Sequence, residues 1–256
     1  MFWFQDRQWS VSVVEPIPPE GARRVVTGRR HRPTYLVPVR SSRRQVQCES
    51  ALERDYVVSV SVEPDVLSLM HQPHSVHLRS GSVVLRYTPD FAVERVVPEG
   101  VKRRTTIVEV KPEHIAAEAV HRERLSLVGA AYTYLALAFE VVTDAAVYRG
   151  AHLMNARLIR SHACVQVPED VATAMRVLLL ARAATTVGGC LAAIGGAATM
   201  AHVLGLAYAG HLALDLVTPI GPATSVAWRY PPGIDALASL RAATFAPRAR
   251  RDARRH

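Results

Sequence analysis

The sequence contains little cysteine, and its three cysteines form no pattern. Cys48, Cys164 and Cys190 are odd in number and far apart, and the 256 residues contain no C-x-x-C pair. This spacing argues against a disulfide framework or a zinc ribbon and indicates a reducing compartment. The first residues also lack the apolar core of a signal peptide. Both absences predict a cytoplasmic protein.

Lysine is almost missing as well. Lys102 and Lys111 are the only lysines among 31 basic residues, and all the others are arginines. An arginine stays charged and presents a planar fork of donors, whereas a lysine is a compact charge whose pKa can be moved. A lysine in so arginine-rich a chain therefore suggests a task for an ammonium group, such as orienting or deprotonating a water molecule.

Acidic residues are scarce at the two ends of the chain. Residues 1–44 carry a net charge of +6 and residues 241–256 a net charge of +5, so the part between them is close to neutral within a total of +9. Basic ends on a neutral body predict arms that contact a polyanion. The alternative is that these ends are solvated tails.

Charge is absent from residues 183–214, a stretch long enough to suggest a membrane helix. The stretch is mostly Ala, Gly and Thr, however, and it contains two Gly-Gly pairs and two histidines. This composition favours short helices of a soluble domain, so we expect no membrane span. Three short helices followed by a strand near Leu212–Val217 indicate a winged-helix or helix-turn-helix unit.

The middle of the chain alternates helical and strand-like patterns. Ser50 and Glu53 form a capping box before a helix over residues 48–62, and residues 113–138 form a long Ala-rich helix. Strands are predicted at Ser75–Leu78, Val83–Tyr87, Asp90–Val97, Thr105–Val110 and Phe139–Thr143. One further helix is predicted at Ala151–Ile159. The order helix, three strands, helix, strand predicts a mixed α/β fold with one central sheet.

Two short segments in this region carry the groups that a metal-dependent nuclease needs. Pro89 and Asp90 precede one predicted strand, and Glu109 and Lys111 lie two residues apart on the next. Alternate side chains of a strand share a face, so Glu109 and Lys111 point the same way. Two carboxylates for a metal ion and one ammonium for the attacking water are thereby predicted on neighbouring strands.

The combination of a helix Glu, a Pro-Asp and a Glu-x-Lys resembles the PD-(D/E)xK restriction-endonuclease-like superfamily. Within it, the run around residues 33–160 is similar to the TnsA endonuclease subunit of heteromeric transposases. The motifs that carry this similarity are Glu49-Ser-Ala-Leu-Glu53-Arg-Asp55, Glu63-Pro-Asp-Val66, Gln72-Pro73, Arg86-Tyr-Thr-Pro-Asp-Phe91 and Val108-Glu-Val-Lys-Pro112. Glu109 departs from the best-known members, which have Gln there, but it matches the superfamily.

The resemblance implies a fold, an activity and partners. The fold is a restriction-endonuclease-like mixed sheet flanked by helices, with a C-terminal winged-helix-like helical domain. The activity is a Mg²⁺-dependent DNA endonuclease, with Mn²⁺ as a substitute, that cuts the 5′ ends of a transposon. The implied partners are a DDE-type transposase and an AAA+ regulator. The expected division of the chain is a basic arm (1–44), a catalytic domain (45–164), a helical domain (165–240) and an Arg-rich tail (241–256).

The implied catalytic residues are Glu53, Asp90, Glu109 and Lys111. The expected metal ligands are Glu53, Asp90, Glu109 and the carbonyl of Val110. Simpler interpretations stay open for these residues. Glu53 could only cap its helix, Asp90 could only follow Pro89 at a strand break, and Glu109 with Lys111 could be an exposed ion pair of little value to stability.

Other polar residues and other functions are open as well. Gln72 either contacts the site or ends a turn, Glu49 and Asp55 are expected to be solvated, and zinc binding by the three nearby histidines is disfavoured. Those histidines are His71, His74 and His77. Alternative functions are a stand-alone nuclease of the same fold in restriction or repair, and a non-catalytic DNA-binding adaptor.

Overall fold

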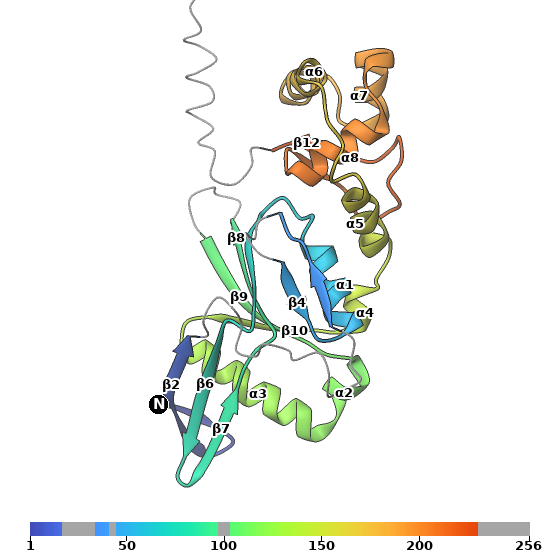
Figure 1. Cartoon of the computed structure of the whole chain (residues 1–256). Coiled ribbons are helices and arrows are strands. Elements are labelled where there is room, and N and C mark those ends of the chain that lie inside the picture. Colours follow the sequence, from blue (N-terminus) through green and yellow to red (C-terminus); the bar gives the residue numbers. More distant parts are fainter. Residues whose placement is uncertain (17–33, 41–44, 97–102, 230–256) are drawn as a thin grey trace, which may run out of the picture.

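The computed structural model describes residues 1–16, 34–40, 45–96 and 103–229, and they form a mixed α/β structure (Figure 1). The lower part of Figure 1 contains two four-stranded sheets with α1 to α4, and the upper part contains α6 to α8. Lys102 and the expected Arg-rich tail (241–256) lie outside the described residues.

The central sheet has the strand order β10-β9-β8-β5. Its strands are β5 (Val66–His71), β8 (Phe91–Val96), β9 (Arg103–Val110) and β10 (Ala138–Val142). β5 and β9 both run antiparallel to β8, while β10 runs parallel to β9. The parallel pair needs a crossover connection, and α2 (Glu113–Ala117) with α3 (Ala119–Tyr134) supplies it. The mixed α/β class is therefore confirmed, whereas the expectation of one central sheet is wrong, because the described residues form a second four-stranded sheet as well.

Helices cover both faces of this sheet. On one face, Tyr56 and Val57 of α1 (Ala51–Val60) share a core with Val108 and Val110 of β9. On the opposite face, residues of α3 share a core with Ile107. Because side chains alternate along β9, Glu109 lies on the Ile107 side, between strand and α3.

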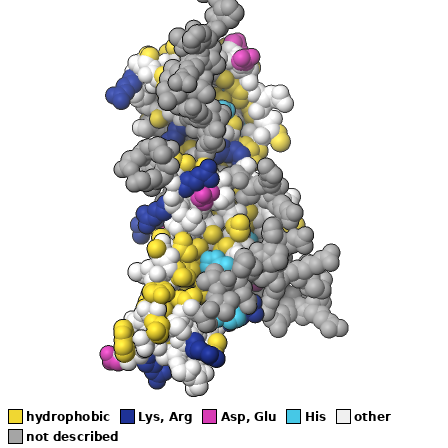
Figure 2. Space-filling view, turned by 90° about the vertical axis from the view of Figure 1, so that its left-hand side faces the viewer, with side chains coloured by type: hydrophobic (Ala, Val, Ile, Leu, Met, Phe, Trp, Pro, Cys, Tyr) yellow, Lys and Arg dark blue, Asp and Glu magenta, His cyan; other side chains and the backbone are white. Residues whose placement is uncertain are grey.

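The N-terminal residues differ from the expected extended arm. They form β1 (Phe2–Phe4) and β2 (Arg7–Pro16), which join β6 (His74–Ser80) and β7 (Val83–Tyr87) in an antiparallel sheet of order β1-β2-β6-β7. Trp9 is buried in the core under α3, whereas Trp3 points to the outer face and is 70% exposed. Figure 2 shows hydrophobic side chains gathered over this lower part of the molecule.

The strand over residues 83–97 is divided between the two sheets. We expected Asp90–Val97 to continue the strand that ends at Tyr87, but β7 belongs to the N-terminal sheet and β8 to the central sheet. Residues 88–90 connect them, so Asp90 lies where the chain passes from one sheet to the other. The strand β5 was not expected from the sequence. The short strand β3 (Tyr35–Val37) pairs with β4 (Val46–Cys48).

The upper part is a helical unit with its own core. It contains α6 (Glu169–Leu180), α7 (Val187–Ile194), the 3-10 turn η1 (Gly195–Ala197), α8 (Met200–Ala209), and the antiparallel pair β11 (Leu212–Leu214) and β12 (Val226–Trp228). Its core also includes Val62, and Ala156 and Ile159 of α5 (His152–Ser161). The expected boundary at 164/165 therefore lies inside a shared core, because α5 packs with the helices that follow it.

Contacts outside that core also connect the two parts. Arg160 of α5 donates to the carbonyl of Pro38 at 2.8 Å and to Ser61 Oγ at 2.9 Å. Arg40 donates to the carbonyl of Ala209 at the end of α8. Within the described residues no single helix is long and apolar enough to span a membrane. The segments Val187–Ala197 and Met200–Ala209 reach that length and apolar composition only when they are taken together, and the chain bends by 115° between them.

Candidate active site at the end of β9

Asp90 is placed beside β9 by the pairing of the two strands. The register of β8 and β9 sets Phe91 opposite Val108, so the residue before Phe91 lies near the last residues of β9. The Oδ2 atom of Asp90 accepts a hydrogen bond of 2.8 Å from the amide of Val110. Asp90 therefore does more than end a strand, because it is bonded to the residue between Glu109 and Lys111.

Glu109 is buried, with only 5% of the residue exposed. Its Oε1 atom accepts from the Lys111 ammonium at 2.5 Å, and its Oε2 atom accepts from the Tyr87 hydroxyl at 2.6 Å. Glu109 and Lys111 thus point the same way, as the alternation predicts. They do not form an exposed ion pair, since the Lys111 side chain is 25% exposed and its partner is buried.

Glu53 lies in the first turn of α1 and has two roles. As a capping residue, its amide donates to Ser50 Oγ at 3.1 Å, and its carboxylate accepts from Ser50 Oγ at 2.9 Å and from the Glu49 amide at 2.7 Å. The predicted capping box is therefore formed. Burial raises the pKa of Glu53, and the charges of Glu49 and Glu109 raise it further. Glu53 therefore belongs electrostatically to the same cluster as Glu109.

The cluster contains more negative than positive charge. Burial raises the pKa of Asp90 to about 8, and the charges of Glu109 and then Glu53 add to this shift. The Val110 amide and the Lys111 ammonium act in the opposite direction but do not cancel it. Asp90, Glu53 and Glu109 (called the carboxylate cluster below) therefore lie close enough to influence one another, and Lys111 is the cation bonded to Glu109.

The donor set suits a hard divalent cation. Carboxylate oxygens, a backbone carbonyl and water are the ligands that Mg²⁺ prefers. A divalent charge would favour the ionised form of Asp90, whose pKa is raised by burial and by the neighbouring carboxylates. Over the described ranges no three His, Cys, Asp or Glu residues already converge closely enough to hold a metal ion. The oxygen atoms of these residues are therefore ligands of the type that Mg²⁺ prefers. Their side chains lie near one another but do not form a complete coordination shell.

Gln72, which the sequence left open, contacts this region. Its amide donates to the carbonyl of Asp90 at 2.8 Å, and its side-chain nitrogen donates to Glu49 at 3.2 Å. Gln72 also has a positive φ of 42°, which is uncommon for a residue with a side chain and occurs mostly where surrounding contacts enforce it. Glu49 is consequently bonded at the edge of the site and not simply solvated.

Asp55 is not solvated either. It is 4% exposed, and it accepts hydrogen bonds from Arg54 at 2.9 Å, Arg157 at 3.0 Å and Tyr148 at 3.2 Å. These partners hold the pKa of the Asp55 carboxyl below its usual value in spite of its burial. Helical periodicity did not indicate this burial, because two of the three partners come from distant segments. Asp55 connects α1 to α4 (Asp144–Val147) and α5.

The three histidines do not converge. His71 is on β5 of the central sheet and packs against Phe91, whereas His74 and His77 are on β6. His74 is bonded through Nε2 to the Tyr132 hydroxyl at 2.9 Å.

Sequence reasoning missed Tyr87 as a functional candidate. It lies in the quoted Pro-Asp motif, yet its role depends on the register of two sheets. The alternation along 83–87 predicts which face Tyr87 takes but not that Glu109 lies opposite its hydroxyl.

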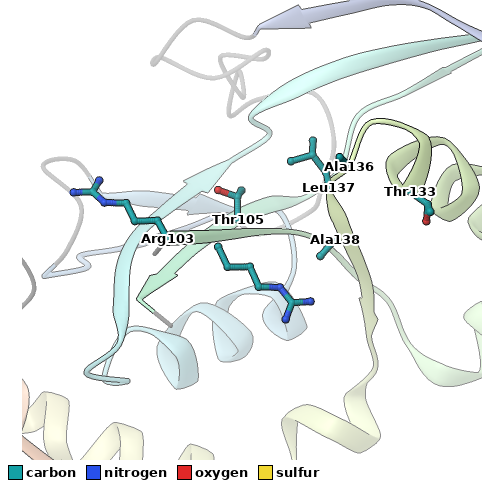
Figure 3. Close-up of a pocket in the computed structure, with 7 residues that line it drawn as sticks. Arg103, Thr105, Thr133, Ala136, Leu137 and Ala138 are labelled. Atoms are coloured by element: carbon teal, nitrogen blue, oxygen red, sulfur yellow. The ribbon is translucent and has the colours of Figure 1, made fainter. Parts of the chain in front are cut away.

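A pocket of about 580 Å³ lies at the opposite end of β9 (Figure 3). It is lined by Arg103, Arg104, Thr105, Thr133, Ala136, Leu137 and Ala138. Figure 3 shows Arg103 pointing away from Thr133 and Ala138, as expected for one of two consecutive strand residues that face opposite sides. The pocket therefore lacks a convergent set of charged groups and is separate from the carboxylate cluster.

Comparison with known proteins gives no family for this chain: no family model matches it, and no curated protein matches it. The residues at the end of β9 are therefore the basis for any functional assignment.

Proposed function

We propose that this chain is a Mg²⁺-dependent DNA endonuclease similar to the TnsA subunit of heteromeric transposases. The observation that carries the proposal is the meeting of Asp90, Glu109 and Lys111 at the end of β9, with Glu53 of α1 beside them. Glu53 and Asp90 are 37 positions apart in the sequence. Their meeting therefore depends on the tertiary structure. Two acids and a lysine at one strand end are the groups that phosphodiester hydrolysis requires.

The arrangement of elements supports a restriction-endonuclease-like fold. A helix (α1) precedes three antiparallel strands (β5, β8 and β9), and a helix (α3) then leads to a parallel strand (β10). In the upper unit, three helices precede the pair β11 and β12, and an isolated bridge joins Thr186 to Ser225. This order supports the winged-helix-like character proposed for that unit.

Asp90 and Glu109 would hold the metal ion, with Glu53 and the Val110 carbonyl as further ligands. Bound Mg²⁺ or Mn²⁺ would supply Lewis-acid polarisation of the scissile phosphate. Lys111 would orient the attacking water and offset negative charge that develops on the phosphate oxygens. Its ammonium is already held at 2.5 Å from Glu109, so it is positioned before DNA binds.

The proposed partners follow from charge and from the resemblance. A net charge of +9 favours binding to DNA, whose phosphates attract arginine side chains. The DDE-type transposase and the AAA+ regulator are proposed from the similarity to TnsA alone.

A metal titration of wild type and Asp90→Asn tests the proposal. We expect millimolar Mg²⁺ or Mn²⁺ to raise the melting temperature of the wild type, because a metal that binds the folded state stabilises it. Asp90→Asn should lose that response and the cleavage of DNA. Asp170→Asn is the matched control, since Asp170 is an exposed residue in the first turn of α6.

The outcome also separates the alternative functions. A wild-type melting temperature that ignores divalent metal would favour a non-catalytic DNA-binding adaptor. A metal response with cleavage of DNA by the isolated chain would favour a stand-alone nuclease. A metal response with cleavage only in the presence of a transposase would favour the TnsA-like subunit.

A further inference from the structure

Each carboxylate oxygen of Glu109 accepts one hydrogen bond, one from the Tyr87 hydroxyl and one from the Lys111 ammonium. Tyr87 donates to Oε2 at 2.6 Å and Lys111 to Oε1 at 2.5 Å. Lys111 lies just beyond the end of β9, while Tyr87 is the last residue of β7 in the other sheet. One carboxylate is thus held from two sheets, at the point where the chain crosses between them.

The ring of Tyr87 has little freedom to move. The residue is 5% exposed and pairs with Val76 of β6 through the strand register. Its ring meets Phe139 edge-on at a centroid distance of 6.3 Å, and the Arg124 guanidinium lies 5.8 Å from its centre. A hydroxyl carried on so constrained a ring is a donor with a set position.

A tyrosine phenol is protonated at neutral pH, so the Tyr87 hydroxyl has a hydrogen to donate, and the Glu109 carboxylate has none. Glu109 is the acceptor that the structure provides, and no proton transfer by Tyr87 is needed for this role.

We propose that Tyr87 is a positioning residue that holds the Glu109 carboxylate in place for a divalent metal ion, an inference that rests on the proposed function. A carboxylate side chain without a hydrogen-bond partner loses rotamer freedom when it binds a cation. A donor that already holds the carboxylate in one rotamer lowers this entropy cost of metal binding. Groups of this kind behind a metal ligand typically contribute about 10- to 100-fold to metal affinity or activity.

Tyr132 provides a matched control within the same core. It is also fully buried, and its ring stacks on the same Phe139 at 5.4 Å. Its hydroxyl, however, is bonded to His74 at 2.9 Å. Tyr132→Phe and Tyr87→Phe therefore remove the same atom from the same aromatic cluster, and only the second removes a hydrogen bond to Glu109.

The test is a titration of the full-length variants with Mg²⁺ and Mn²⁺. At each metal concentration the melting temperature and the cleavage of a DNA duplex are measured. We expect Tyr87→Phe to need about 10- to 100-fold more metal for half of the maximal stabilisation, and excess metal to restore much of its cleavage. Tyr132→Phe should keep the wild-type metal dependence. An unchanged or lower metal requirement in Tyr87→Phe, or an equal increase in both variants, would overturn the proposal.

A double-mutant cycle with Glu109→Gln checks that the effect passes through Glu109. Tyr87→Phe should change the metal requirement of the wild type but not that of Glu109→Gln. An equal effect in both backgrounds would show that Tyr87 acts by another route. If the wild type itself does not respond to metal, the proposed function fails; if it responds and Tyr87→Phe responds identically, only the role of Tyr87 fails.

Discussion

The amide of Val110 donates a 2.8 Å hydrogen bond to Oδ2 of Asp90. The two residues are far apart in the sequence, and the bond attaches the turn before β8 to the end of β9. Because Val110 lies between Glu109 and Lys111, this hydrogen bond from a backbone amide to a carboxylate holds Asp90 beside the residue that separates them. The following predictions depend on this arrangement.

Replacing Lys111 tests the charge balance of the carboxylate cluster. Lys111→Ala should abolish DNA cleavage, since it removes the only cation bonded to Glu109 among the described residues. Glu109 is buried, so we also expect the free energy of unfolding without metal to fall by about 1–3 kcal/mol. Activity assays with any required partners, together with urea unfolding in EDTA, measure both effects.

Arg103→Ala is the matched control for Lys111→Ala. Arg103 is a cation at the other end of β9, and its side chain is 69% exposed. Its removal should leave stability nearly unchanged, because exposed ion pairs contribute little. Equal cleavage by Lys111→Ala and Arg103→Ala would exclude a catalytic role for Lys111.

The raised pKa of Asp90 predicts that the metal-free protein loses stability as the pH rises. In the unfolded chain Asp90 ionises near pH 4, whereas in the folded protein its pKa is about 8. Between these values the folded state binds the extra proton, so stability falls with increasing pH by at most about 1.4 kcal/mol per unit. Urea unfolding in EDTA from pH 5 to pH 8 should show this slope, and Asp90→Asn should reduce it. The same slope in both proteins would mean that Asp90 ionises normally.

Cutting the chain after residue 164 should destabilise what remains. Ala156 and Ile159 of α5 and Val62 are buried in the core formed with α6, α7 and α8. Removal of those helices exposes this apolar surface, and each large side chain returned to water costs about 1.5–3 kcal/mol. We expect residues 1–164 to melt below the full chain or to aggregate. An unchanged melting temperature of that fragment would show that the two parts are independent.

Gly210 leaves room for a contact between the two parts, because it has no side chain where Arg40 packs. Its φ is 83°, and a Cβ atom there would collide with the Arg40 guanidinium, which bonds to the carbonyl of Ala209. Gly210→Ala should destabilise the protein by more than the roughly 1–2 kcal/mol of a left-handed alanine. Gly81→Ala provides the comparison, because its φ is 58° and the space around it is open. Equal melting temperatures for the two variants would mean that Arg40 moves away freely.

Much of the local structure was predictable because it depends on residues close together in the chain. Ser50 and Glu53 form their capping box as expected, and the alternation along β9 directs Val108 and Val110 to one core and Glu109 to the other side. The single helix expected over residues 113–138 is divided into α2 and α3 and ends at Tyr134, and the strand expected after it is present as β10, although its parallel direction was not predicted.

The sequence by itself determined the mixed α/β class, the choice of Asp90, Glu109 and Lys111 as candidate site residues, and the shared direction of Glu109 and Lys111. Only the tertiary structure decided that residues 2–16 complete a sheet, that β7 and β8 separate, that Asp55 is buried, and that Tyr87 meets Glu109. The reason is physical: capping and alternation depend on neighbouring residues, whereas strand partners, buried charges and the partner of a hydroxyl depend on which distant segments pack together.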